Sequence, residues 1–368
     1  MPVSPAVHQK GPPHRRAAAG AMARRFAGLL LAACLTLPGA AGATDLEATA
    51  RRFDHPDRYR LLFSRLIDRG VPLARVTAAF SSAKAQRRDR EAVALRTDVQ
   101  RIPEHREAER QANERYVYEA RLLADHLREH ADIYQRMEAK YRIRREIIGA
   151  ILLKESALGR YDAFGHDAFV VFNSLHDGLS LTEDASDRMR RRVPRLIRMA
   201  REQLIALIIY TYRRDLELAT TPFPASYAGA IGIPQWLPVH LEHAVSADDT
   251  APDLTHMPDA ILSTANLLRN EFGWPDAMLT FDRLANLDRI VAAWRDFDQG
   301  GASFAAGRNS DGQAVRRFDR AHADMPNVPY VATYVRHLMR YNYSSDYALG
   351  VLRIAARTHR QLAGKDPG

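Results

Sequence analysis

From Thr44 onward, apolar residues recur at intervals of three and four positions, the spacing of one buried helix face. Residues 58–80 follow this pattern with one interruption at Gly70–Pro72. Alternation of apolar and polar residues at every second position is scarce, so any sheet should be small. The chain is therefore predicted to be mainly α, with little or no sheet. The helical pattern returns in four later segments, which are 116–141, 184–217, 258–272 and 330–359.

Two stretches between these segments lack a clear pattern. Residues 84–114 are very polar and include Pro103, which favours a solvated helix or an exposed connection over a binding patch. This stretch suggests a soft boundary between an N-terminal helical region, 44–115, and a main domain, 116–368. The stretch that follows Arg160 contains scattered glycine and asparagine residues and is expected to be irregular.

One predicted helix carries a carboxylate among apolar residues. Within Ile147–Arg160, Glu155 lies four residues after Ile151 and three after Leu152, so it projects from their apolar face. An ionised carboxylate is costly to bury unless it is paired, protonated or used. Gly159 can end this helix as a C-cap. On this segment alone, a functional glutamate and a rim glutamate that touches solvent remain equal alternatives.

Two further segments carry polar and aromatic groups suited to a sugar ligand. Residues 225–238 contain two glycines and a Pro-Gln-Trp sequence, which predict a shaped loop rather than a helix or a strand. Arg340–Ser344 joins tyrosine rings to an asparagine. Aromatic rings stack on sugar faces, and amide side chains bond sugar substituents. A carboxylic acid kept protonated by an apolar setting is the group that glycosidic cleavage needs.

The charge of the chain does not indicate nucleic-acid binding. The formal net charge of the 368 residues is +9, and five of these charges lie in residues 1–43. The rest of the chain carries an excess of +4, which suits an anionic surface or polymer, and no basic run is interleaved with aromatic residues. We therefore expect no nucleic-acid partner.

Residues 1–43 have the composition of a secretion signal. Arg24 and Arg25 precede the apolar run Phe26–Leu37, and Ala41–Ala43 offers an A-x-A cleavage site. Residues 1–21 add nothing that a signal needs, so Met22 is an alternative start of the natural protein. The apolar run is too short for a transmembrane helix.

A second mode of processing remains open at the same segment. Leu31–Cys34 resembles a bacterial lipobox, in which Cys34 would be lipidated and would anchor the protein in the outer membrane. Cys34 is the only cysteine, so the mature domain has no disulfide by either route. Both routes place the domain in the bacterial envelope, and we expect the periplasm.

The sequence lacks the motifs of serine hydrolases and of zinc metalloproteases. Neither G-x-S-x-G nor H-E-x-x-H occurs. His240–His243 places two histidines and a glutamate within one helical turn, a pattern more often found in ordinary polar residues than in a metal site.

Four segments, in this order, resemble the lytic murein transglycosylase B family, whose members cut the glycan strands of bacterial peptidoglycan. The most specific is Ser226–Pro238, which matches S-[FY]-A-G-A-x-G-x-x-Q-[FW]-x-P. The resemblance covers about residues 58–358 and implies a lysozyme-like helical core around an active-site groove. The four segments are Tyr141–Gly159, Ser226–Pro238, Asp259–Trp274 and Arg340–Val351.

The resemblance also implies roles for individual residues. Glu155 would be the single catalytic acid/base, and Ser226, Gln235, Tyr341 and Asn342 would line the groove and hold the substrate. The reaction implied is cleavage between N-acetylmuramic acid and N-acetylglucosamine with formation of a 1,6-anhydro ring. We expect Glu155 to be protonated in the resting groove, because its apolar setting would raise its pKa.

Two departures from the family pattern affect the prediction. Residues 155–159 lack the family's frequent Glu-Thr sequence, so the neighbouring sugar subsite should differ. Ser246–Asp253 lacks the ligand spacing of the calcium loop that some members carry. We therefore predict that the enzyme binds no calcium or other metal. We also expect it to use no organic cofactor and to act as a monomer.

Two other functions remain as alternatives. A hydrolytic muramidase on the same scaffold would need a second carboxylate, for which Asp162, Asp167 and Glu183 are the nearest candidates in sequence. A non-catalytic peptidoglycan-binding module would keep the groove without turnover. Retention of Glu155 together with the predicted groove residues argues against the module.

Overall fold

The computed structural model describes residues 39–98, 107–108, 111, 113, 115–160, 164–299 and 310–364. The predicted signal sequence up to residue 38, with the Met22 start and Cys34, lies outside the described residues. Helix α1 (Gly39–Ala50) covers the predicted cleavage site at Ala41–Ala43. From Ala41 to Gly368 the chain forms one compact unit.

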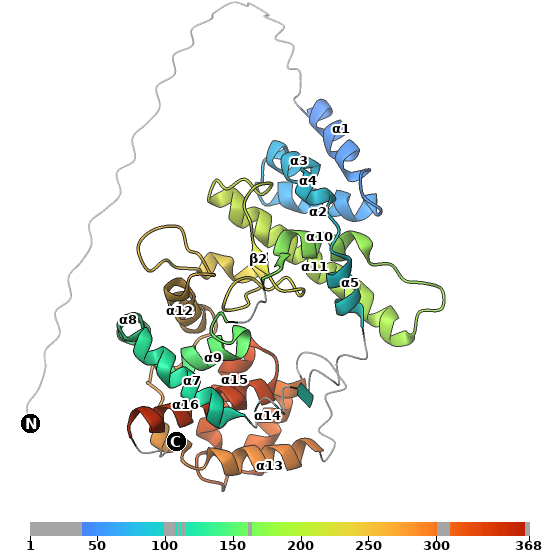
Figure 1. Ribbon diagram of the computed structural model, residues 1–368. Coiled ribbons are helices and arrows are strands. Elements are labelled where there is room, and N and C mark those ends of the chain that lie inside the picture. The colour runs from blue at the N-terminus through green and yellow to red at the C-terminus, as the bar shows by residue number, and fades with distance from the viewer. Residues whose placement is uncertain are drawn as a thin grey trace, which may run out of the picture. The chain divides into compact units, whose positions relative to one another are not determined.

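Helices dominate this unit, as Figure 1 shows. The only described sheet pairs β1 (His166–Asp167) with β2 (Pro224–Ala225) in antiparallel register. The predicted mainly α class with very little sheet is therefore confirmed. No described helix has both the length and the apolar composition needed to span a bilayer. The other elements before β2 are α2 (Pro56–Asp68), α3 (Leu73–Ser81), α4 (Ala83–Gln86), α5 (Arg90–Thr97), α7 (Tyr116–Glu129), α8 (Ala131–Tyr141), α9 (Arg145–Ser156), α10 (Ala168–Gly178) and α11 (Asp187–Arg213).

The second half of the unit follows β2. The break between α15 and α16 falls at Asn342–Ser344, inside the segment predicted to be helical throughout. The elements are η1 (Pro238–His243), α12 (Met257–Asn266), the π-helical turn η2 (Leu267–Glu271), η3 (Phe281–Leu284), α13 (Leu287–Gln299), α14 (Ser310–Ala321), α15 (Val328–Tyr341) and α16 (Ser345–Leu362).

The stretch after Arg160 is not irregular as expected, because it contains α10. Every residue of this helix from Ala168 to Asp177 is buried, so the helix has no solvent-exposed face to mark its period in the sequence. Its start is fixed by Asp167, whose side chain accepts hydrogen bonds from the Phe169 and Val170 amides at 3.0 and 3.3 Å.

The polar stretch 84–114 is not solvated throughout. Helices α4 and α5 pack against α10, and Ala85 and Ala92 are fully buried. Asp89 on this stretch bonds His166 with 2.6 Å between Oδ2 and Nδ1. The hydrophobic pattern does not predict this contact, because each of the two helices buries only one alanine, Ala85 or Ala92, among charged and polar neighbours.

Helix α9 lies inside the core and contacts α7, α8, α12 and α16. Its residues from Glu146 to Leu153 are buried on all sides, and only Arg145 at its start and Lys154 and Glu155 near its end are partly exposed. Gly149 allows α7 to come close, because a Cβ there would lie 2.4 Å from Leu123 Cδ1. The sequence predicted one apolar face, and the structure shows burial all round.

The end of α9 has an unusual backbone. Ala157, Leu158 and Gly159 follow one another with φ angles of 50°, 60° and 75°, in the left-handed region. The Ala157 amide donates to Leu153 O at 2.9 Å, and Ser156 Oγ accepts from the Gly159 amide at 3.0 Å. The helix therefore ends before Gly159, and two residues other than glycine adopt a conformation that costs free energy.

The left-handed backbone at Ala157 predicts a stabilising substitution. Ala157→Gly removes the Cβ that opposes this conformation and should raise the free energy of unfolding by about 0.5–1 kcal/mol. Ala139→Gly is the control, since Ala139 is an exposed residue inside α8 and should lose a similar amount. Urea unfolding measures both, and a loss of stability in Ala157→Gly would contradict the strain.

Candidate active site

The loop between β2 and η1 folds into a tight hairpin. Ile231 and Trp236 exchange two backbone hydrogen bonds, of 2.7 and 3.0 Å. Between them, the backbone N–H of Gln235 donates to Gly232 O at 3.1 Å, and Gln235 has a φ of 52°. The turn therefore fixes Gln235 at its tip, as expected for a shaped loop.

Both glycines of this loop are required by close packing. Gly229 and Gly232 have φ angles of 76° and 65°. A Cβ on Gly229 would lie 2.4 Å from Phe172 Cζ, and one on Gly232 would lie 2.6 Å from Leu254 O. Any side chain at either position would push the loop away from the core.

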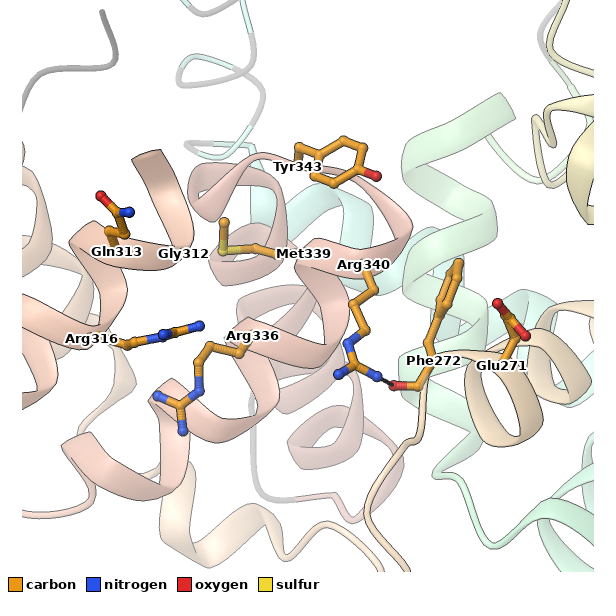
Figure 2. A pocket seen from close by; sticks show the side chains of 9 residues that line it. All are labelled: Glu271, Phe272, Gly312, Gln313, Arg316, Arg336, Met339, Arg340 and Tyr343. Atoms are coloured by element: carbon orange, nitrogen blue, oxygen red, sulfur yellow. Dashed lines mark hydrogen bonds between the residues drawn. The ribbon is translucent and has the colours of Figure 1, made fainter. Parts of the chain in front are cut away.

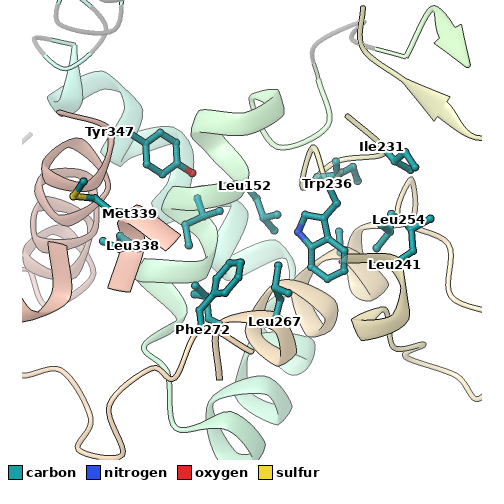
Figure 3. Close-up of a cluster of buried hydrophobic side chains, with 14 of the residues drawn as sticks. Leu152, Ile231, Trp236, Leu241, Leu254, Leu267, Phe272, Leu338, Met339 and Tyr347 are labelled. Carbon is teal, nitrogen blue, oxygen red and sulfur yellow. The ribbon is translucent and has the colours of Figure 1, made fainter. Parts of the chain in front are cut away.

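The hydroxyl of Tyr341 joins the end of α15 to this loop. Trp236 Nε1 donates a hydrogen bond to Tyr341 Oη at 3.0 Å, and that hydroxyl donates to Pro234 O at 2.5 Å. The Phe272 ring meets the Tyr341 ring edge-on, with 6.3 Å between their centroids. Figure 3 shows Trp236 and Phe272 in the buried cluster that also contains Leu152 of α9.

Glu155 lies close enough to this junction to affect its chemistry. Burial raises the pKa of Tyr341 far above its ordinary value, and the negative charge of Glu155 raises it further, against the hydrogen bond from Trp236. A second link joins the end of α9 to the loop, because Ile233 Cδ1 would lie 3.2 Å from a Cβ on Gly159. The structure therefore brings Glu155, the loop and the end of α15 together.

Three predicted substrate-binding residues keep polar atoms available. Ser226 Oγ, Gln235 Oε1 and the Asn342 amide make no hydrogen bond with any residue that the structure describes, and the three side chains are partly exposed. Gln235 Nε2 is held by Gly232 O at 2.9 Å, which orients the amide. The Tyr341 hydroxyl, by contrast, is already used within the protein. Substrate contact by these four residues stays a prediction.

The segment Asp259–Trp274 contributes support that sequence reasoning missed. Buried Asp259 accepts hydrogen bonds from the Ala247 and Asp253 amides at 2.9 and 2.8 Å. Ser263 Oγ bonds the Val245 amide at 3.0 Å. Polar residues on the buried face of one short helix were the signal, because such residues need partners.

The arginine before Tyr341 supports the fold in a similar way. Arg340 Nη1 donates to Phe272 O at 2.6 Å (Figure 2), and Arg269 Nη1 donates to Trp274 O at 2.9 Å. The two arginines thus fix the chain on both sides of Gly273.

The candidate metal-binding group includes none of the predicted site residues. In the part of the chain that the structure describes, one group of three, His126, Glu129 and His130, has ligand atoms within 4.8 Å of one another. The histidines of 240–243 are not in such a group, and their neighbour Glu242 pairs with Arg213 at 3.0 Å. The expectation that the enzyme uses no metal stays a prediction.

A buried helix with a glutamate in its last turn thus lies beside a loop and a tail that have available amide and hydroxyl groups, which suits the binding and cleavage of a glycan. Residues 57–356 match the family model described as the transglycosylase SLT domain. The chain belongs to this transglycosylase family. No curated protein matches the chain in sequence.

Solved structures of lytic transglycosylases share this fold. Escherichia coli SLT35 in complex with bulgecin A is 16% identical, with a TM-score of 0.54 over 84% of this chain and 94% of that chain. Pseudomonas aeruginosa SltB3 in complex with NAG-anhNAM-pentapeptide is 18% identical, with a TM-score of 0.50 over 80% of this chain and 77% of that chain. The resemblance to the lytic murein transglycosylase B family, the lysozyme-like fold and the enzyme class are confirmed.

Tyr341→Phe tests the junction between loop and tail. The change leaves the Trp236 N–H and the Pro234 carbonyl without their partner, so the free energy of unfolding should fall by about 1–3 kcal/mol. Tyr118→Phe is the control, because the Tyr118 side chain is exposed and should lose less than about 0.5 kcal/mol. Denaturant unfolding of both variants gives the comparison, and equal losses would contradict the role of the Tyr341 hydroxyl.

Proposed function

We propose that the protein is an exported lytic transglycosylase of peptidoglycan. It cleaves the β-1,4 bond between N-acetylmuramic acid and N-acetylglucosamine and forms 1,6-anhydromuramic acid, with Glu155 as the single acid/base. The observation that carries the proposal is the junction at which the end of α9, which carries Glu155, approaches the loop at Ile233 while the Tyr341 hydroxyl ties the loop to the tail. SltB3, which shares the fold, was solved in complex with NAG-anhNAM-pentapeptide.

The proposed reaction uses one carboxyl group twice. Glu155 as an acid gives its proton to the glycosidic oxygen while the C1–O bond breaks, and N-acetylglucosamine leaves as an alcohol. The Glu155 carboxylate then takes the proton of the muramyl C6 hydroxyl, whose oxygen attacks C1 and closes the anhydro ring. The acid form of Glu155 is restored and no water is consumed.

The available polar groups fit the binding of the sugar substituents. Ser226, Gln235 and Asn342 offer a hydroxyl and two amides, which can bond the hydroxyl and acetamido groups of the glycan. Tyr341 positions Gln235 and Asn342, because it bonds Pro234 and directly precedes Asn342. A bound sugar would therefore be held from both the loop and the tail.

The candidates for a second catalytic carboxylate have less support than Glu155 has. Asp167 is used within the fold, where it pairs with Lys84 at 2.9 Å and accepts the Phe223 amide at 3.0 Å. Glu183 is an exposed residue between α10 and α11, and Asp162 lies outside the described residues. A transglycosylase needs no second carboxylate, whereas a hydrolytic muramidase does.

The remaining predictions concern the whole protein. The sequence supports export to the periplasm, either by cleavage after Ala43 or with a lipid anchor on Cys34. The division into an N-terminal region, 44–115, and a catalytic domain, 116–368, is proposed on the same basis. A monomer that acts on glycan strands without a cofactor completes the proposal.

Digestion of murein sacculi tests the function. The wild-type protein should release 1,6-anhydromuropeptides, identified by mass spectrometry. Glu155→Gln keeps the shape of the side chain but cannot donate and accept the proton, so release should fall by at least about 10²-fold. Glu183→Gln is the matched control and should retain the wild-type rate, because Glu183 is exposed.

Two outcomes would contradict the proposal. Products with a free reducing end would support the hydrolytic muramidase. Binding of sacculi by the wild type without release would support the non-catalytic module.

A further inference from the structure

Two histidines and a glutamate meet where α7 ends and α8 begins. His126, Glu129 and His130 each offer a nitrogen or oxygen atom as a metal ligand, and these atoms lie within 4.8 Å of one another. The backbone N–H of His130 donates to His126 O at 3.0 Å, so the helical turn between the two histidines is complete. Residues three and four positions apart on such a turn share one face. The backbone therefore holds the three side chains together without any ligand.

The two histidine rings lie close together, and one of them is fixed. Their centroids are 4.4 Å apart, with 56° between the ring planes. His126 is buried, and its Nε2 forms a hydrogen bond of 3.2 Å with the hydroxyl of Tyr134. The other nitrogen of this ring makes no hydrogen bond with any residue that the structure describes. Metal-binding histidines typically have this arrangement, in which a hydrogen bond at one nitrogen orients the ring and the other nitrogen binds the ion.

The two remaining side chains are accessible and lack partners. Glu129 is exposed and His130 is partly exposed. Neither side chain forms a hydrogen bond or an ion pair with any described residue. Asp125 and Arg128, which lie on the same turn of α7, pair with each other at 2.7 Å. A carboxylate and an imidazole are thus available beside the fixed ring of His126.

Arg160 is a positive charge near the cluster that opposes the binding of a cation. Burial lowers the pKa of His126, and the charges of His130 and Arg160 lower it further. Arg160 is exposed, so its guanidinium group stays in water, where its repulsion of an ion is weakened. The carboxylate of Glu129 offsets this charge within the cluster itself.

The cluster is joined to the helix that carries Glu155. The Tyr134 side chain, which bonds His126, is fully buried. Its hydroxyl would lie 3.3 Å from a Cβ on Gly149, in the middle of α9. An ion held at the corner between α7 and α8 would therefore stabilise the packing against which α9 lies.

We propose that His126, Glu129 and His130 bind a divalent transition-metal ion of the Zn²⁺ type, which stabilises the corner between α7 and α8. Imidazole nitrogens and a carboxylate oxygen are ligands of such ions, and a water molecule would complete four-coordination. Ligand atoms around a tetrahedral Zn²⁺ are roughly 3.3 Å apart, so rotation of the accessible Glu129 and His130 side chains would close the site.

This inference goes beyond the proposed function, because the reaction proposed for Glu155 needs no metal. It also revises the prediction, made from the sequence, that the enzyme binds no metal. That prediction considered the missing calcium loop and the histidines of 240–243, and it did not consider the turn at 126–130.

The experiment measures Zn²⁺ binding by isothermal titration calorimetry near neutral pH in four proteins. These are wild type and the variants His130→Gln, Glu129→Gln and His243→Gln. His243→Gln is the matched control, because His243 is also partly exposed and belongs to the other histidine pair of the chain. Thermal unfolding of each protein without metal shows that it folds, and the same measurement with Zn²⁺ or Ca²⁺ gives the stabilisation.

Wild type should bind one Zn²⁺, and a concentration about 100-fold above Kd should raise Tm by about 3–5 °C. The affinity should fall at least about tenfold in His130→Gln and in Glu129→Gln, because loss of even a group that supports a ligand costs this much. His243→Gln should bind as wild type does. Ca²⁺ should leave Tm unchanged, because it prefers six to eight oxygen ligands.

Three results would overturn the inference. The first is wild-type binding weaker than a Kd of about 100 μM, or equal affinity in all four proteins. The second is loss of binding in His243→Gln alone, which would assign the metal to the 240–243 pair. The third is stabilisation by Ca²⁺ that is lost in Glu129→Gln but kept in His130→Gln, which would indicate a site made of oxygen ligands. None of these results concerns glycan cleavage, so the digestion of sacculi tests the proposed function separately.

Discussion

The site depends on one phenolic hydroxyl that holds two distant parts of the chain together. Tyr341 accepts a hydrogen bond from the Trp236 indole and donates one to Pro234 O, so the end of α15 and the hairpin loop are fixed to each other. Gln235 follows Pro234 and Asn342 follows Tyr341, which places an amide on each side of the junction. A hydroxyl buried in an apolar setting requires such partners, since an unsatisfied one would be costly.

The polar residues of the family motifs divide into two groups by what they bond. Asp259, Ser263 and Arg340 make hydrogen bonds to backbone groups and hold the segments around the site. Ser226 and Asn342 keep their side chains available to a ligand. The strained backbone that follows Glu155 fits a site whose geometry matters more than its stability. The motifs therefore combine side chains that are available to a ligand with side chains that hold the backbone around them.

Periodicity predicted the helical class and the break between α2 and α3, and the motifs picked out Glu155, the loop and the end of α15, three segments that the structure brings together. They missed α10, because a helix that is buried on every side has no solvent-exposed face to mark its period. The contact of α4 and α5 with α10 was hidden by their charged residues. The role of the Tyr341 hydroxyl could not be predicted either, because it depends on where a loop of unknown shape places the Pro234 carbonyl.

The central claim is that Glu155 acts on a glycan held between the loop and the tail. A crystal structure of Glu155→Gln with a bound peptidoglycan fragment that contains an uncleaved bond measures this most directly. The account predicts that the amide at position 155 lies about 2.6–3.2 Å from the glycosidic oxygen, and that Ser226, Gln235 and Asn342 contact the adjoining sugars. A fragment bound with its glycosidic oxygens beyond the reach of position 155 would contradict it.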